Sequence, residues 1–235
     1  MAIDSYLTTN KLKKSGKILE NLVKIYQKYQ DSQDPDHIDI DGTLAYLLDL
    51  GIESDDPRAL VLAYYLQAPS IGVFNKNSFL SQWQQQKVTN LLEMKSFIDK
   101  IYKIIVTNDT NHSITINDQL INFENFYNFT FDFLMVNENQ KLLDLATAVD
   151  YWKLLLPLLS QDEHVLTRFN QWYDFISQEY KRSISKDSWS MIYLFIQDIL
   201  MKDPINFKGY DEMAAWPSVI DEYIEYLREN NLLHS

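Results

Sequence analysis

Apolar residues recur at steps of three and four along almost the whole chain, and this spacing restricts the possible folds most. It marks one helical face in residues 18–29 and another in residues 91–105. Three further segments of this kind follow in series: "DLATAVDYWKLLLPLL", "EHVLTRFNQWYDFISQEY" and "SKDSWSMIYLFIQDIL". Alternation typical of strands is nearly absent, and "SITIN" at 113–117 is a weak example. The pattern predicts an all-α fold.

The composition agrees with a packed helical protein. The chain has 235 residues, of which 46% are hydrophobic and 14% aromatic, enough for a sizeable core. Five glycines and six prolines are too few for the many turns of an all-β fold. Neither a signal-peptide core nor a stretch of about 18 uninterrupted apolar residues is found. We therefore expect a soluble intracellular protein that does not bind membranes.

The charge and the cysteine content of the chain argue against several classes of function. The formal net charge of −12 disfavours nucleic acid as a partner and favours a basic protein surface. The absence of cysteine excludes disulfides, cysteine-based zinc sites and a thioester-forming nucleophile. The four histidines are scattered, and no catalytic triad or phosphate loop is apparent. A non-catalytic protein without metal or cofactor is favoured; a hydrolase with a carboxylate pair is a weaker alternative.

The polar segment "TNDTNHSITINDQ" at 107–119 divides the chain most clearly. We predict an N-terminal extension over 1–16, a helical subdomain over 17–106, a mobile loop over 107–119 and a C-terminal helical subdomain over 120–235. Residues 18–50 and 57–86 read as two similar helix–loop–helix units. The aromatic run "FYNFTFDFL" at 126–134 predicts a largely buried central helix.

The first helix–loop–helix unit invites comparison with a calcium-binding EF-hand. Its acidic loop is "DSQDPDHIDIDG" at 31–42, whose Ile-Asp-Ile segment could form a short strand. A calcium loop needs Gly at position six and Glu at position twelve, where this loop has Asp36 and Gly42. The second loop, "APSIGVFNKNSF", has no carboxylate. We predict an EF-hand-like scaffold without metal, and a calcium-responsive adaptor remains the alternative.

The C-terminal stretch "YDEMAAWPSVIDEYIEYL" places small alanines beside a Trp-Pro pair. Between Asp211 and Glu229 there are six acids and one base, Arg228. A capped and solvated terminal helix would explain this composition. A docking surface for a basic partner would explain it equally well, so both interpretations stay open on the residues alone.

Several motifs in the same order resemble the potentiating-neddylation domain of the defective-in-cullin-neddylation family. They are "IDIDGTLAYLLDLGI", "FTFDF", "DYWKLLL", "KRSISKDSW" and the C-terminal stretch. The resemblance extends over about residues 17–229. The resemblance implies an all-α fold with an EF-hand-like N-terminal half. It also implies a monomeric co-ligase of the cytoplasm and nucleus. This scaffold would hold a cullin and an N-terminally acetylated conjugating enzyme together, so that the ubiquitin-like modifier passes to a cullin lysine.

The resemblance implies two binding sites. An acidic patch for the C-terminal domain of the cullin consists of Asp187, Ala215 and Asp221. Trp216 and Pro217 would anchor the chain and start the helix there. An apolar pocket for the acetylated methionine of the conjugating enzyme consists of Ile40, Thr43, Ala59, Leu60, Leu62, Ala63, Ile71, Phe74, Phe133, Tyr151 and Leu154. Each pocket residue is equally plausible as an ordinary core residue.

The sequence departs from its relatives at several positions. Thr43 and Ala59 stand where larger aliphatic residues are usual, and Ile71-Gly72 replaces a Gln-Cys pair. The 107–119 segment is longer and more polar than in relatives. About sixteen residues precede the match, too few for the ubiquitin-binding domain that many relatives carry. These differences affect the expected shape of the pocket.

Overall fold

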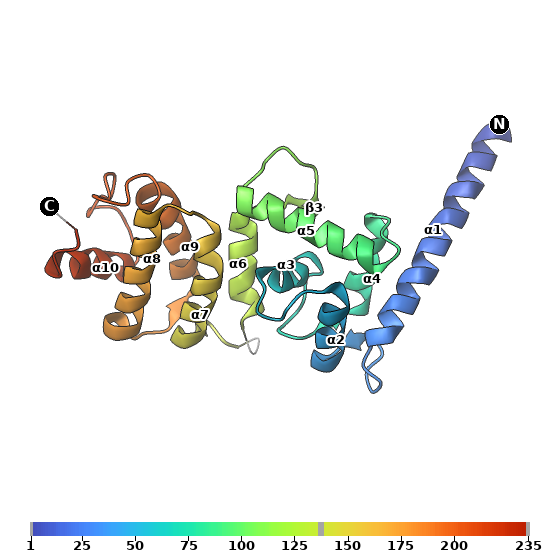
Figure 1. The fold of residues 1–235 in the computed structure, drawn as a ribbon, viewed down its shortest axis with the longest axis horizontal. Coiled ribbons are helices and arrows are strands. Elements are labelled where there is room, and N and C mark those ends of the chain that lie inside the picture. Colours follow the sequence, from blue (N-terminus) through green and yellow to red (C-terminus); the bar gives the residue numbers. More distant parts are fainter. Residues whose placement is uncertain (1, 136–138, 234–235) are drawn as a thin grey trace. The chain divides into compact units, whose positions relative to one another are not determined.

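The structure is a computed structural model that describes residues 2–135 and 139–233, with side chains from residue 15 onward. The chain forms two compact units, Met1–Asn122 and Phe123–Ser235 (Figure 1). Helices dominate both units, which confirms the predicted all-α class. None of the helices in the described ranges combines the length and apolar character needed to cross a bilayer.

The first unit consists of two helix–loop–helix pairs followed by a long helix. Its helices are α1 (Ala2–Tyr29), α2 (Ile40–Leu50), α3 (Pro57–Tyr65), α4 (Lys76–Gln85) and α5 (Leu91–Thr107). Helix α1 runs without a break through the segment predicted as an N-terminal extension. Helix α3 begins at a proline after an aspartate cap, as the sequence predicts, because proline fits a first helical position that needs no N–H partner.

Two short strands join the loops of these pairs. Strand β1 (His37–Ile38) pairs antiparallel with β2 (Phe74–Asn75), with Ile38 opposite Phe74. Both residues are buried, so the strand pair fixes the two loops against the core. This is the EF-hand arrangement that the sequence predicts. In the core of this unit, the ring of Phe79 lies 5.5 Å from the rings of both Tyr26 and Tyr46, measured between centroids.

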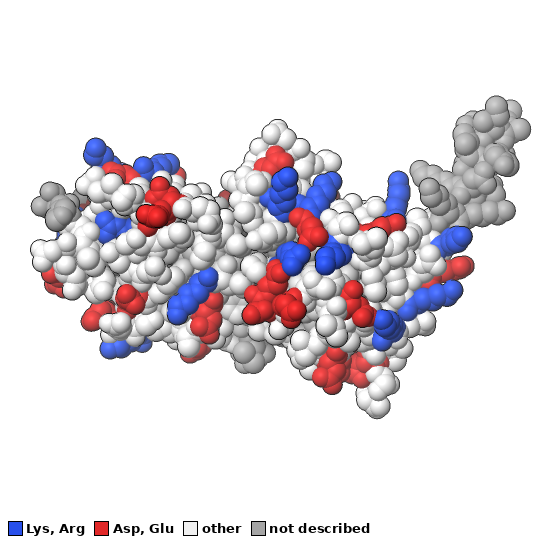
Figure 2. All heavy atoms as spheres, viewed as in Figure 1, with Lys and Arg blue, Asp and Glu red and all other residues white. Residues whose placement is uncertain are grey.

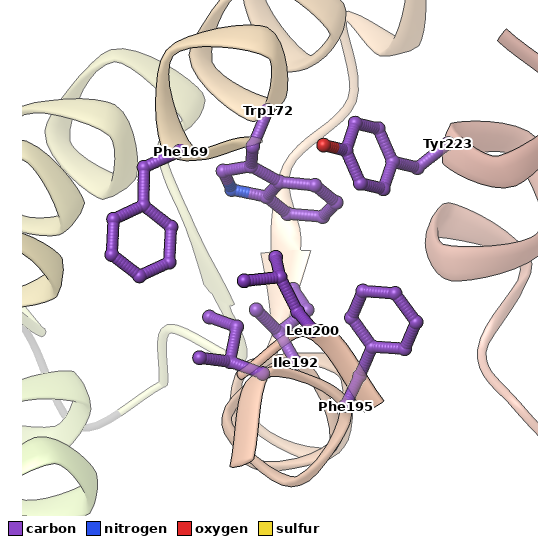
Figure 3. A pocket seen from close by; sticks show the side chains of 7 residues that line it. Phe169, Trp172, Ile192, Phe195, Leu200 and Tyr223 are labelled. Atoms are coloured by element: carbon purple, nitrogen blue, oxygen red, sulfur yellow. The ribbon is translucent and has the colours of Figure 1, made fainter. Parts of the chain in front are cut away.

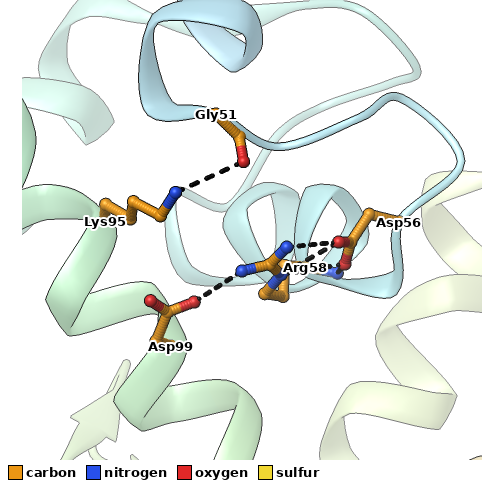
Figure 4. A network of polar contacts seen from close by, with 5 residues as sticks. All are labelled: Gly51, Asp56, Arg58, Lys95 and Asp99. Atoms are coloured by element: carbon orange, nitrogen blue, oxygen red, sulfur yellow. Dashed lines mark hydrogen bonds and ion pairs between the residues drawn. The ribbon is translucent and has the colours of Figure 1, made fainter.

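A polar network holds α3 against α5 (Figure 4). The Arg58 guanidinium binds both oxygens of Asp56 on its own helix cap and donates to Asp99 of α5 at 2.9 Å. Lys95, one turn earlier on α5, donates to the carbonyl of Gly51 at 3.4 Å. Hydrogen bonds from Arg58 lower the pKa of the Asp56 carboxyl.

The 107–119 segment contains a small hairpin in the first unit. Strands β3 (Thr115–Ile116) and β4 (Gln119–Leu120) pair antiparallel. The two residues between them, Asn117 and Asp118, have φ angles of 50° and 63°, which suit the tight turn of a two-residue hairpin. Ile116 is buried, so the segment is attached to the unit by more than its ends.

In its described residues, the second unit is a bundle of five α-helices with one short strand pair. The helices are α6 (Phe123–Phe133), α7 (Leu145–Leu155), α8 (Glu163–Phe175), α9 (Lys186–Phe195) and α10 (Ser218–Glu229). Strand β5 (Leu142–Leu143) pairs with β6 (Ile184–Ser185). The 3-10 helix η1 (Leu156–Leu158) follows α7, and single π-helical turns, η2 (Ile176–Tyr180) and η3 (Ile196–Leu200), extend α8 and α9.

Stacked and hydrogen-bonded aromatic rings form the core of the second unit. Tyr127 of α6 stacks on Trp189 at 4.6 Å, and Trp189 stacks on Trp152 at 5.2 Å. The indole N–H of Trp152 donates to the Tyr127 hydroxyl at 2.8 Å, and that of Trp189 donates to the Tyr127 carbonyl at 3.0 Å. The predicted burial of the aromatic run in α6 is confirmed for most of its rings, with Phe129 half-buried.

Arg168 of α8 is a buried cation in this unit. Its guanidinium donates to the carbonyls of Pro204, Ile205 and Leu232 at 2.6, 2.8 and 2.9 Å, and it lies over the ring of Phe207. Burial lowers its pKa. The carbonyls compensate for lost hydration, and Arg168 thereby attaches two loop segments to α8.

Candidate functional site

The exposed part of the predicted apolar pocket lies where α2 begins. The side chains of Ile40 and Ile71 are 50% and 55% exposed. Gly72, next to Ile71, has a φ of +76°, and a Cβ there would lie 2.4 Å from the Ile40 Cδ1 atom. Glycine is therefore favoured on two grounds, the left-handed backbone and the close approach of Ile40.

Thr43 connects helix α2 with the turn that contains Gly72. Its hydroxyl donates to the Gly72 carbonyl at 3.0 Å, and the side chain is buried. An aliphatic residue of similar size could fill this space but could not donate that hydrogen bond. The departures at Thr43 and Ile71-Gly72 are therefore one structural feature, a hydrogen-bonded contact between α2 and the turn before β2.

The other predicted pocket residues of the first unit belong to its core. Ala59 is half-buried, whereas Leu62 is completely buried. Near-complete burial also applies to Leu60, Ala63 and Phe74. In the first unit, the predicted pocket residues thus divide into an exposed pair, Ile40 and Ile71, and a mostly buried group, which we call the wall.

Three predicted pocket residues lie in the second unit. Phe133, the last residue of α6, is buried and stacks on Phe129 at a centroid distance of 5.5 Å. Tyr151 and Leu154 are half-buried and three residues apart on α7, which places them on one face of that helix. Burial raises the pKa of the Tyr151 hydroxyl, so it is neutral at physiological pH.

All three residues assigned to the acidic patch are exposed on the second unit. Asp187 lies in the first turn of α9, where a carboxylate stabilises the positive end of the helix dipole. Asp221 lies in the first turn of α10 and accepts a hydrogen bond from the Tyr210 hydroxyl at 2.6 Å. Among the described residues, neither aspartate forms an ion pair.

The predicted Trp-Pro anchor is present. The Trp216 ring packs edge-on against Phe195 of α9 at 5.9 Å, and α10 begins directly after Pro217. The exposed Ala215 is therefore directly followed by a residue whose ring is packed in place.

Two of the six acids between Asp211 and Glu229 are compensated by ion pairs. Glu212 pairs with Arg228, and Glu222 pairs with Arg182, which lies outside the stretch. On the face drawn in Figure 2, acidic and basic side chains are interspersed within each unit. Sequence analysis also missed Tyr210. Its role arises from the loop that brings it to Asp221, and nothing in the sequence pattern indicates that approach.

A small apolar cavity of about 10 Å³ lies behind the Phe195 contact (Figure 3). It is lined by Phe169, Trp172, Ile192, Phe195, Ile196, Leu200 and Tyr223. The indole nitrogen of Trp172 is buried there without a hydrogen-bond partner. A buried water needs two to four polar partners, so this space is a packing defect rather than a ligand site.

The acidic loop of the first unit uses its carboxylates locally. Asp31 and Asp34 accept backbone N–H groups two residues further on, and Asp34 also contacts His37. Asp39 caps α2 by accepting from the Gly42 N–H at 2.9 Å. Within the described ranges, no group of three or more acidic, histidine or cysteine side chains is arranged to hold a metal ion.

Comparison with known proteins identifies the family. A family model described as cullin binding matches residues 93–226. The defective in cullin neddylation protein 1 of Candida albicans is 46% identical over 92% of this chain and 81% of its own length. The protein of that name from Yarrowia lipolytica is 36% identical over 97% of this chain and 85% of its own length. The one from Saccharomyces cerevisiae is 27% identical over 89% of this chain and 72% of its own length. The chain therefore belongs to the cullin-binding family of defective-in-cullin-neddylation proteins.

Proposed function

We propose that this protein is a scaffold in cullin neddylation that binds a cullin and the neddylation conjugating enzyme together. The observation that carries the proposal is the cullin-binding family match over 93–226, together with relatives named for a defect in cullin neddylation. The scaffold would contribute no chemical step. It would raise the effective concentration of the modifier's thioester near the acceptor lysine and orient the two.

The acidic patch of Asp187, Ala215 and Asp221 is the proposed cullin site. Its acids are exposed, and the small side chain of Ala215 leaves room for close approach. A basic cullin face would gain mainly in association rate if the acids lie at the rim of the interface. Tyr210 holds the Asp221 carboxylate in one position and so reduces the entropy lost on binding.

The pocket residues of the first unit are the proposed site for the acetylated N-terminus of the conjugating enzyme. Ile40 and Ile71 offer exposed apolar surface, and the Thr43 bond to Gly72 fixes their separation. Acetylation removes the charge of the terminal amine, whose burial without a partner would be costly. Acetylated N-terminal peptides should therefore bind much more tightly than unacetylated ones, and equal affinities in a calorimetric titration would refute this part.

A reconstituted neddylation assay tests the whole proposal. Purified conjugating enzyme charged with the modifier is mixed with the C-terminal domain of a cullin, with and without this protein. We expect faster modification of the cullin when the protein is present. A protein with substitutions in both proposed sites serves as the control for non-specific crowding. An unchanged rate with the wild-type protein would reject the scaffold function.

A further inference from the structure

Met213 is an unusually exposed apolar residue beside the proposed cullin site. Its side chain is 91% exposed, more than any other large apolar side chain in the described part of the chain. Single exposed apolar residues are common and need no explanation. Met213 differs because the neighbouring Ala214 and Ala215 are also exposed, so three consecutive apolar residues face water.

The backbone around Met213 is held in place. Its N–H donates to the Asp211 carboxylate at 2.9 Å, and the N–H of Ala214 donates to the Asp211 carbonyl at 3.1 Å. The N–H of Trp216 then donates to the Ala214 carbonyl at 2.9 Å. With the Trp216 ring packed on α9, the turn presents Met213 outward at a fixed place.

Acidic side chains lie next to this apolar turn. Asp211 and Glu212 precede Met213 directly, and Glu212 is paired with Arg228. Tyr210 connects the same turn to Asp221 of α10. An apolar centre with a charged rim is the usual organisation of a protein interface. Methionine suits such a centre because its flexible, polarisable side chain adapts to an irregular pocket.

We propose that Met213 is the apolar anchor of the cullin-binding surface. It would enter an apolar depression on the cullin whose border carries basic side chains complementary to Asp211 and Asp221. This inference rests on the proposed function and assigns within it a residue that sets affinity. Met213 lies inside the part of the chain that matches the cullin-binding family.

The proposal separates two contributions to binding. Burial of the Met213 side chain occurs only in the formed complex, so it should govern dissociation. The acids attract a basic partner from a distance, so they should govern association and its dependence on salt. A substitution of Met213 and one of Asp221 should therefore change different rate constants.

The test measures binding kinetics of the full chain to a purified cullin C-terminal domain at several salt concentrations. Met213→Ser should raise the dissociation rate about tenfold or more, with association and salt dependence as in the wild type. Met213→Leu, which keeps an apolar side chain, should dissociate within about twofold of the wild type. Asp221→Asn should instead slow association and weaken its salt dependence. Leu92→Ser, at another exposed apolar residue in the first unit, is the matched control and should change neither rate.

The outcomes distinguish this inference from the function it rests on. If the wild type binds and Asp221→Asn slows association while Met213→Ser dissociates normally, Met213 is no anchor and the cullin site still stands. If Met213→Leu is as damaging as Met213→Ser, apolar insertion is rejected. If the wild type does not bind the cullin domain at all, both the inference and the proposed function are wrong.

Discussion

The two units combine binding surface and core in different ways. In the first unit, most residues of the proposed pocket are also core residues, and Leu62 is completely buried. In the second unit, all three residues of the proposed acidic patch are exposed, and the aromatic core lies elsewhere, around Tyr127, Trp152 and Trp189.

This difference determines how each site can be studied and how each can change. A substitution in the buried wall of the first unit alters packing and binding together, because interiors are close-packed. A substitution in the patch of the second unit alters charge at the surface and leaves the packing intact. Folding therefore constrains most residues of the proposed pocket, whereas the exposed residues of the proposed patch are under less constraint from packing.

Leu62→Ala should show the largest effect on stability. Removing a completely buried leucine side chain from α3 should lower the free energy of unfolding by about 2–5 kcal/mol. Ile71→Ala, at an exposed residue of the same proposed pocket, is the matched control and should stay within about 0.5 kcal/mol. Chemical denaturation followed by circular dichroism measures both. Equal effects would mean that the proposed pocket does not divide into wall and surface.

Thr43→Val should show an intermediate effect. The valine keeps the volume but leaves the Gly72 carbonyl without its donor, at a cost of about 1–2 kcal/mol. Loss of this bond should also free the 70–73 turn, so affinity for an acetylated peptide should fall. Thr110→Val, at an exposed threonine of the 107–119 segment, controls for the loss of a hydroxyl. Unchanged stability and affinity would show that the Thr43 bond does not hold the turn.

The Asp56–Arg58 pair should give a smaller, pH-dependent effect of about 1 kcal/mol. The pKa of Asp56 in the folded chain lies below the ordinary carboxyl value of 3.8, so the pair stabilises the fold above that value. The stabilisation is lost as the pH falls through the lowered pKa. Unfolding of Asp56→Asn, compared with wild type between pH 7 and pH 2, should show a stability difference that shrinks on acidification. A constant difference would contradict this origin.

The smallest stability effects are expected in the acidic patch. Asp187→Ala, Ala215→Arg and Asp221→Lys should each change the free energy of unfolding by no more than about 0.5 kcal/mol, because all three residues are exposed. Cullin binding and cullin neddylation should nevertheless fall sharply. A protein with all three substitutions that still binds and stimulates normally would eliminate the patch as the docking site.

The main elements of the fold could be predicted from local patterns. The proline and aspartate at the start of α3, the apolar spacing of α5 and the Trp-Pro start of α10 are all encoded within a few residues. Features that depend on contacts distant in sequence could not be predicted. The π-helical turns after Phe175 and Phe195 are one example, and the carbonyl contacts of Arg168 are another.

The candidate sites show the same division. The family resemblance assigns Asp187, Ala215 and Asp221 to the patch, but it cannot reveal that Tyr210 binds Asp221 across eleven residues. Similarly, the sequence marks Thr43 and Gly72 as separate departures, although the folded chain joins them in one hydrogen bond. Loop geometry determines both contacts, and single residues carry little information about it.

The distribution of the five tryptophans, all within the described ranges, provides an intrinsic optical reporter. Trp83 is the single indole of the first unit, and it is fully buried. In the second unit, Trp152, Trp172 and Trp189 are buried as well, and only Trp216 is half-buried. A small aqueous quencher should therefore reach Trp216 first, and a partner that covers the acidic patch should shield its emission. Docking on the second unit could be followed in this way without any label.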